Sequence, residues 1–313
     1  MEDLVRHVLS CDERSSFTVD WPSGSTFLVS FASIFGTNII LAAIGALLFT
    51  MKRRKQTHQQ FFLLVALLLA LFPLCLFHVV KEGLGEERVL YQLGFFFSGT
   101  MFSLSVFRTI EVALDTTPQG AKISMQEFIL YFTASIDPQY KLSKEGDSAP
   151  PVALQPGALG AALLTIILRL TTLMVVCSVH SAHSGRPFAV LVASASTVPA
   201  VLFGSWCLDN VFQTTTIWLF LALFLDISSV MLILQQRAPI VGFRNPVFAS
   251  TSPREFWGKR WNLQINSNLK RAVFLPMLTY GAPKVLASVA TFVASAAFHE
   301  YQFVLAMGLV DKG

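Results

Sequence analysis

Charged side chains are scarce in this sequence. Asp, Glu, Lys and Arg make up 13% of its 313 residues, whereas a soluble domain has about 25%. Hydrophobic residues make up 53%, and the mean hydropathy is +0.59. A soluble domain cannot cover so much apolar surface with so few charges, so the composition excludes that class and predicts an integral membrane protein.

The usual signs of several other classes are also missing. The four cysteines are scattered without a CxxC pair, so we expect packing roles for them. His180 and His183 offer two metal ligands, but no clustered Cys, Asp or Glu completes a zinc set, and we expect no metal. There is no Gly-rich phosphate loop, Gly-x-Ser-x-Gly elbow or nucleic-acid signature. We attribute the net charge of +4 to basic loops and expect no nucleic-acid partner.

A secretory signal peptide is not recognisable at the N-terminus. Residues 1–25 are polar and lack a basic stretch followed by an apolar one; their acidic residues are Glu2, Asp3, Asp12, Glu13 and Asp20. We therefore expect a polar N-terminal segment over 1–25 and a first apolar run that is retained as an anchor.

Long apolar runs, in contrast, are abundant. A bilayer core of about 30 Å requires roughly 20 apolar residues per helix. The predicted fold is all-α, a polytopic transmembrane helical bundle of about 7–8 spans that forms one domain over 26–313. The seven runs are 27–50, 61–80, 90–107, 158–179, 188–207, 217–234 and 285–310, and a shorter or broken eighth is 272–283.

Basic residues in short loops predict the orientation of such a chain. Residues 52–55 (Lys-Arg-Arg-Lys) predict a cytosolic loop, and so do seven basic residues within 237–271. One crossing per run would place these two loops on opposite sides, so one run must be re-entrant, interfacial or divided. The weakest candidates are 90–107 and 188–207, the second of which Pro199 interrupts. The polar segment 108–157 between the third and fourth runs is predicted to be a linker or an amphipathic cap.

Two charged residues lie within apolar runs. Arg169 and Asp226 either pair across helices or line a substrate tunnel, since charges in a bilayer face a partner or a cavity. Pairing is the preferred interpretation.

The segment FASTSPREFWGKRWN, residues 248–262, combines basic and large aromatic side chains at the end of the second basic loop. Ser252 is a predicted helix cap, Pro253 suits the first helical position, and Glu255 can close a capping box. A helix continued through this segment has two arcs. One arc carries Phe256, Trp257, Arg260 and Trp261; the other carries Glu255, Gly258, Lys259 and Asn262. An interface anchor with snorkelling bases is an alternative interpretation of this pattern.

The last apolar run contains an ionisable pair, His299 and Glu300. Such a pair is costly in lipid and is normally kept toward the bundle interior or a cavity. A buried imidazole stays neutral and can accept a proton, and Ser295, one turn earlier, is in reach to fix its tautomer. A histidine that only joins two helices by hydrogen bonds is the alternative.

The two segments together resemble the membrane-bound O-acyltransferase superfamily, in its wax-synthase branch. FASTSPREFWGKRWN is followed by His299 within SAAFHE, 37 residues after Asn262. Lys259 stands where this branch more often has Arg. The direct resemblance covers residues 245–309, and relatives usually continue through further membrane helices beyond the histidine.

The resemblance implies transfer of an acyl group from acyl-CoA to a long-chain alcohol to form a wax ester, with His299 as general base and Asn262 as its partner. It implies no permanently bound cofactor; acyl-CoA is a co-substrate. The expected phosphate contacts are Arg254, Lys259 and Arg260, and the expected supporting residues are Trp257, Trp261, Ser295 and Glu300.

Other functions remain open from the sequence. A sterol or terpenoid alcohol could be the acceptor on the same scaffold. A proton-coupled transporter or lipid-binding membrane protein could use the His-Glu pair without catalysis. The expected partners are acyl-CoA, a lipid alcohol and membrane lipids, and the expected location is the endoplasmic reticulum membrane.

Overall fold

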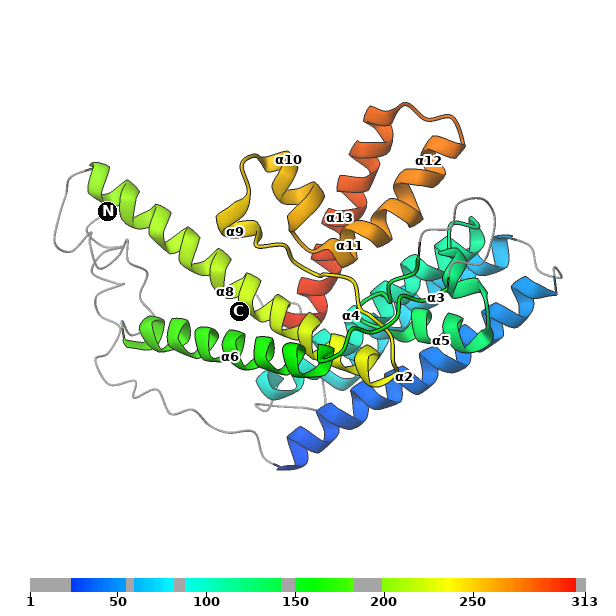
Figure 1. Cartoon of the computed structure of the whole chain (residues 1–313), viewed down its shortest axis with the longest axis horizontal. Coiled ribbons are helices and arrows are strands. Elements are labelled where there is room, and N and C mark those ends of the chain that lie inside the picture. The colour runs from blue at the N-terminus through cyan, green and yellow to red at the C-terminus, as the bar shows by residue number, and fades with distance from the viewer. Residues whose placement is uncertain (1–23, 55–58, 82–87, 142–149, 183–198, 308–313) are drawn as a thin grey trace.

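The computed structural model describes residues 24–54, 59–81, 88–141, 150–182 and 199–307 (Figure 1). Within these residues the chain is helical, and bridges between extended segments are isolated, which confirms the predicted all-α fold. The long helices are α2 (Gly24–Arg53), α3 (Gln59–Lys81), α4 (Arg88–Ala113), α6 (Ala158–Ala182), α8 (Pro199–Leu234) and α13 (Lys284–Met307). The short ones are η2 (Gln119–Lys122), α5 (Met125–Thr133), α9 (Pro246–Ala249), α10 (Pro253–Glu255), η3 (Phe256–Arg260), α11 (Leu263–Leu269), η4 (Lys270–Phe274) and α12 (Leu275–Thr279).

Three helical segments in the described part of the chain are long and apolar enough to cross a membrane: Ala32–Arg53, Ala158–Val176 and Trp206–Leu234. No residue in the apolar window of the second is fully buried, so much of that helix is available to lipid beside its contact with α8. The chain is therefore a membrane protein, while the larger count of 7–8 spans stays a prediction.

The structure corrects the predicted runs 188–207 and 217–234. From Pro199 onward both belong to α8, one continuous helix of 36 residues. The described part of this helix runs unbroken from Pro199 to Leu234. Residues 188–198, like the polar segment 1–23 and the His183 end of the histidine pair, lie outside the described residues.

The segment after α4 is a packed cap. Ser124 begins α5 by accepting a hydrogen bond from the Glu127 amide at 3.1 Å. Phe128 and Phe132 of α5 are buried in one hydrophobic cluster with side chains of α2, α3 and α4. A Cβ atom at Gly45 of α2 would lie 3.0 Å from the Phe132 ring, so the glycine allows this close approach. The amphipathic-cap interpretation of this region is confirmed for α5.

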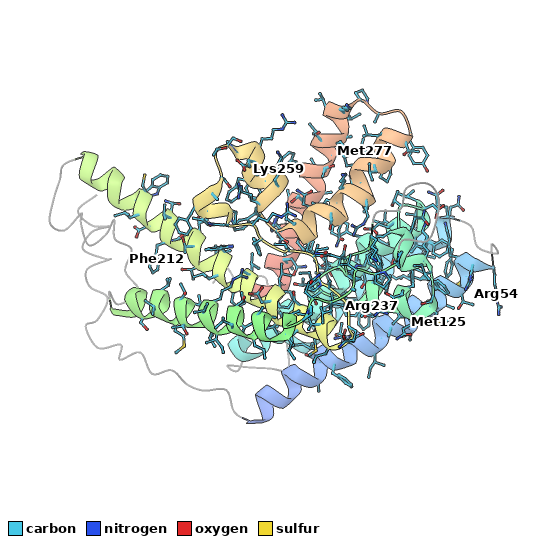
Figure 2. All side chains as sticks on the ribbon, in the orientation of Figure 1. Arg54, Met125, Phe212, Arg237, Lys259 and Met277 are labelled. Atoms are coloured by element: carbon cyan, nitrogen blue, oxygen red, sulfur yellow. The ribbon has the colours of Figure 1, made fainter. Side chains whose placement is uncertain are left out.

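Ion pairs connect Lys52, in the first basic loop, and Arg237, at the start of the second, to the region after α4. Lys52 at the end of α2 lies 3.8 Å from Asp115, which follows α4. Arg237, just after α8, pairs with Glu127 of α5, and α5 itself packs on α2. In Figure 2, Arg54 and Arg237 both lie on the right-hand side, whereas Lys259 of the second loop lies apart from them. A common cytosolic side for the two loops stays a prediction.

α13 is held against α4 and α11 by small and aromatic side chains. Leu104 of α4 and Ile265 of α11 form a buried cluster that Ala294 and Phe298 of α13 cover. One turn beyond, the buried Gln302 amide donates to the Ser103 hydroxyl at 2.6 Å. These contacts fix the depth and rotation of α13, and with them the position of His299.

The charged residues within the apolar runs pair with each other. Arg169 of α6 donates to Asp226 of α8 at 2.6 Å, and both side chains are mostly buried. Neither residue lines any of the three cavities described below, so helix pairing is confirmed as their arrangement.

Candidate active site

The start of the aromatic and basic segment forms as its sequence predicts. The Ser252 hydroxyl accepts from the Glu255 amide at 3.2 Å. The Glu255 carboxylate accepts a hydrogen bond from the Thr251 amide at 3.1 Å. In a capping box the donor would be the Ser252 amide, one residue later. Hydrogen bonds from the Thr251 side chain and backbone, and then from Arg260, lower the pKa of Glu255 to about 2. The carboxylate is therefore ionised and fixes the entry into this segment.

The helix does not continue to Asn262, and the prediction of two arcs is wrong. Residues Phe256–Arg260 form a π-helix, Trp261 is extended, and Asn262 has a positive φ of 35°. Asn tolerates this left-handed conformation better than most residues. Its side-chain oxygen accepts from the Ile265 amide at 3.3 Å and caps α11. The wide turn and the cap thus redirect the chain between Arg260 and Leu263.

The aromatic residues of the segment pack on one another. Trp261 stacks on Phe256 with ring centroids 5.1 Å apart, and its other neighbour, Phe243, meets it edge-on at 5.4 Å. Trp257 contacts both Phe256 and Trp261 edge-on. Asn266 donates to the carbonyl of Trp257 at 2.9 Å and holds the end of the π-helix. The tryptophans are therefore rigidly seated beside Asn262.

A cavity of about 590 Å³ lies between this segment and the first half of α13. We call it the basic cavity because Arg254 and Lys270 border it. Trp257, Ser288 and Phe292 are among its other lining residues. It has the size of a small-molecule site, with cations on an otherwise apolar wall.

A second cavity, of about 550 Å³, lies between α4, α8 and the second half of α13. We call it the apolar cavity, because hydrophobic side chains such as Leu104, Ile217 and Phe220 dominate its wall. The amides of Gln264 and Gln302 also border it, and Gln302 is engaged with Thr100 at 3.0 Å.

The two cavities meet at four residues that line both: Trp261, Asn262, Ile265 and His299. His299 is exposed to this open volume, although it lies on a helix packed against its neighbours. The structure therefore brings together the two predicted catalytic residues, 37 positions apart in the sequence, on one partition between a basic and an apolar compartment.

The other predicted site residues are distributed unevenly. Ser295 lines the basic cavity one turn before His299, and its role in orienting the ring stays a prediction. Glu300 is exposed and lines neither the basic nor the apolar cavity. The predicted His-Glu pair is thus divided, with only the histidine at the partition.

The basic residues also differ in their surroundings. Arg254 borders the basic cavity as predicted, whereas Lys259 is exposed and Arg260 is turned inward. The Arg260 guanidinium pairs with Glu255 at 2.7 Å and donates to the Arg244 carbonyl at 3.0 Å. Lys270, which sequence reasoning did not single out, lies on the cavity where Lys259 and Arg260 do not.

Sequence reasoning also missed a buried ionic cluster that supports α11 from behind. It consists of Arg108, Glu111, Tyr131, Asp137 and Arg271, from three separate regions of the chain. Asp137 accepts from Arg108 at 2.8 Å and from Arg271 at 2.6 Å. The sequence contains a signal for this cluster. Arg108 and Glu111 directly follow an apolar run, and charges in such places need partners.

Gln264 connects the ionic cluster to the partition. Its amide donates to the Asp137 carboxylate at 2.8 Å, and its oxygen accepts from the Asp137 backbone amide at 2.7 Å. Burial raises the pKa of Asp137, but Arg271 and Arg108 lower it more, so the net pKa lies below its ordinary value. An ionised Asp137 thus fixes the first turn of α11, directly after Asn262.

Comparison with known proteins agrees with this geometry. The model of the membrane-bound O-acyltransferase family matches residues 120–311, which include α5, α6, α8, the aromatic segment and α13. An Arabidopsis thaliana protein, "Probable long-chain-alcohol O-fatty-acyltransferase 3", is 38% identical over 66 residues. That match covers 19% of this chain and 19% of the relative. The family match extends over more than half of the sequence, and the chain belongs to the membrane-bound O-acyltransferase family.

Proposed function

We propose that this protein transfers the acyl group of acyl-CoA to a long-chain alcohol and so forms a wax ester. The observation that carries the proposal is the shared wall of the two cavities, where His299 and Asn262 border both the basic and the apolar compartment. A charged donor and an apolar acceptor that arrive from opposite sides would meet at this wall. The relative named as a long-chain-alcohol acyltransferase supports the choice of acceptor.

His299 acts as the general base in this proposal. An alcohol is a weak nucleophile at neutral pH, so a neutral imidazole removes its proton as the oxygen attacks the thioester carbon. The tetrahedral intermediate then collapses, the carbon–sulfur bond breaks, and CoA leaves as a thiolate. A thiol has a pKa of about 8.5, so the leaving group needs little help from an acid.

Asn262 supplies a hydrogen-bond donor for the developing oxyanion. Its side-chain oxygen is already used by the Ile265 amide, which directs its remaining hydrogen-bonding capacity, the NH₂ group, to other partners. A donor in a compartment shielded from water stabilises negative charge far better than it would in bulk solvent. The cap therefore serves to orient the group that the chemistry needs.

The basic cavity receives CoA. Arg254 and Lys270 lie where phosphate groups could be held, and Arg offers a planar fork that suits phosphate oxygens. Because acyl-CoA is charged and cytosolic, this mouth faces the cytosol, the side also proposed for the basic loop 52–55. The endoplasmic reticulum is the proposed membrane. The apolar cavity receives the alcohol from the bilayer, with its hydroxyl directed to His299.

Membership in an acyltransferase family supports an enzyme over a proton-coupled transporter. The decisive experiment supplies labelled acyl-CoA to membranes that contain the full chain, together with primary alcohols, a sterol and a terpenoid alcohol. The proposal expects labelled wax esters, and expects their loss in His299→Ala at equal membrane levels. Esters formed only with the sterol or terpenoid would contradict the proposed acceptor. Equal ester formation by His299→Ala would contradict the proposed base.

A further inference from the structure

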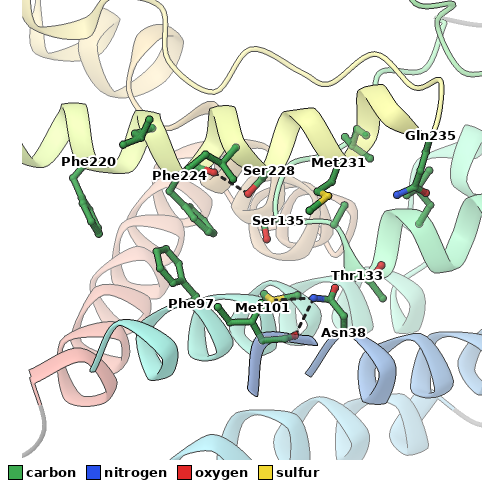
Figure 3. A pocket seen from close by; sticks show the side chains of 16 residues that line it. Asn38, Phe97, Met101, Thr133, Ser135, Phe220, Phe224, Ser228, Met231 and Gln235 are labelled. Atoms are coloured by element: carbon green, nitrogen blue, oxygen red, sulfur yellow. Dashed lines mark hydrogen bonds between the residues drawn. The ribbon is translucent and has the colours of Figure 1, made fainter. Parts of the chain in front are cut away.

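A third cavity, which we call the outer cavity, lies beyond the apolar cavity. It encloses about 370 Å³ between α2, α4, α8 and the residues after α5 (Figure 3). Ser135, Phe220 and Phe224 line both cavities. The basic, apolar and outer cavities therefore form a series in which each shares a wall with the next.

Two phenylalanine rings stand at the boundary of the outer cavity. Phe97 of α4 and Phe224 of α8 stack with centroids 4.8 Å apart and an interplanar angle of 23°. Phe224 borders both cavities, whereas Phe97 lines only the outer one of the pair. In Figure 3 the rings face each other across the space between α8 and α4. The stacked rings thus form part of the wall between the apolar and outer cavities.

The lining of the outer cavity selects for an uncharged occupant. None of its lining residues carries a formal charge. Three of its polar side chains already donate to backbone carbonyls: Asn38 to Ile34 at 3.0 Å, Thr133 to Ile129 at 2.9 Å and Ser228 to Phe224 at 2.8 Å. A phosphate or carboxylate would be buried here without a counter-charge, which is costly. An alkyl chain needs neither a counter-charge nor a hydrogen bond.

We propose that the outer cavity holds the far end of the alcohol's alkyl chain, and that Phe97 and Phe224 set the chain length the enzyme accepts. This inference rests on the proposed function, because it extends the chain whose hydroxyl lies at His299. Short alcohols fit within the apolar cavity. Longer alcohols must pass Phe224, and each further methylene that enters the outer cavity gains about fourfold in binding from burial.

The test compares alcohol-length profiles of full-length variants in membranes. Phe224→Ala and Phe97→Ala open the wall, so the ratio of long-alcohol to short-alcohol turnover should rise by about fourfold per added methylene. Ser228→Trp fills the outer cavity and should lower that ratio. The matched control is Phe72→Ala, because Phe72 also belongs to a ring pair between helices, with Phe102 at 5.4 Å, but lines neither cavity. The control should keep the wild-type ratio.

A binding readout separates this inference from the proposed reaction. Alcohols that carry a photoreactive diazirine at the chain end should label peptides of the outer cavity, around Asn38 and Met231, even in His299→Ala. A diazirine beside the hydroxyl should instead label the apolar cavity. An unchanged length ratio in both Phe variants, a shift only in acyl-length preference, or end-labelling outside the outer cavity would overturn the inference. Wild-type membranes that label as expected but form no ester would overturn the proposed function alone.

Discussion

The ionic cluster and the cavity partition lie on different faces of α11, and their polar groups differ in how far they are already paired. In the ionic cluster, Asp137 receives hydrogen bonds from Arg108, Arg271 and Gln264. At the partition, His299 is exposed to open volume, and within the described residues its ring contact is the edge of Phe298 at 5.6 Å. One face of the helix carries buried charges that are paired with one another, and the other offers groups to a ligand.

This difference distinguishes a region with a structural role, the ionic cluster, from a region that can bind substrate, the cavity partition. A buried charge is tolerated only when it is paired, so the ion pairs of the cluster indicate a structural role. A polar group that lines a cavity keeps its capacity for a substrate. α11 joins the two regions, since Asn262 caps its first residue and Arg271 lies just beyond its last one. The predictions below test whether stability and turnover divide along this helix.

The largest expected effect is on turnover at the partition. His299→Ala should lower ester formation by about 10²- to 10⁴-fold, the usual contribution of a general base. The thermal midpoint of the purified protein should change little, because the ring is exposed. His299→Gln is the matched control, since it keeps polarity and size but has no basic nitrogen, and should be equally inactive. Substantial turnover in the Gln variant would show that His299 only positions the substrate.

The opposite result is expected in the ionic cluster. Asp137→Ala leaves Arg108 and Arg271 buried without their carboxylate, which costs about 3–5 kcal/mol in the free energy of unfolding. The pKa of Asp137 is lowered in the folded state, so its contribution should be present near neutral pH and be lost as the pH falls below about 4. Thermal unfolding in detergent at pH 7 and at about pH 2 measures both effects. Glu300→Ala, at an exposed carboxylate, is the control and should leave stability unchanged.

The sequence predicted what local patterns encode. Ser252 and Glu255 have the spacing of a cap, and the apolar runs have the length of membrane helices, so both appeared without tertiary information. His299 was identified because a histidine within a long apolar run requires an explanation. The partition itself could also be anticipated, but only through the resemblance of two segments to one family.

The errors arose where tertiary contacts override local pattern. A 100° periodicity assumed that the helix continued to Asn262, but the π-turn and the left-handed cap break it. Charge counting could not show that Arg260 pairs with Glu255 or that Lys270 lines the basic cavity. Phosphate contacts of Lys259 and Arg260 stay a prediction. The partners in the ionic cluster are separated by up to 163 positions, from Arg108 to Arg271. No local rule could pair them.

Asn262 belongs to both regions, so its variants sharpen the comparison. Asn262→Asp keeps the oxygen that caps α11 but removes the NH₂ donor. Turnover should fall by about 10²- to 10³-fold, as for the loss of an oxyanion donor, with little change in the KM for acyl-CoA. Asn262→Gly keeps the left-handed backbone and loses both functions, so it should be similarly inactive and less stable by only a few tenths of a kcal/mol. If Asn262→Asp kept its activity, Asn262 would act only as the cap of α11.

A smaller effect is expected at the mouth of the basic cavity. Lys270→Ala and Arg254→Ala should each raise the KM for acyl-CoA by up to about fivefold, since exposed charge contacts are worth at most about 1 kcal/mol. Added salt should raise the wild-type KM in the same direction, because it screens these contacts. Lys259→Ala is the control from the same segment and should have the smallest effect, because Lys259 does not line the cavity. Equal KM changes in all three would indicate a diffuse basic surface.

The smallest expected effect is at Gly258, whose environment is the opposite of that of Gly242. A Cβ atom at Gly258 would meet nothing within 4 Å, although Gly258 lines the basic cavity. Gly258→Ala should therefore change the free energy of unfolding by less than about 0.5 kcal/mol. At Gly242 the same atom would lie 2.5 Å from Leu225 of the buried cluster beside Trp261, so Gly242→Ala should cost about 1–3 kcal/mol. If Gly258→Ala lowers turnover without lowering stability, the glycine leaves space for acyl-CoA, and the effect should grow with Gly258→Val. If Gly258→Ala and Gly242→Ala lose stability equally, Gly258 is packed against other groups in the membrane. The expected difference between a closely packed and an open environment would then be wrong for this segment.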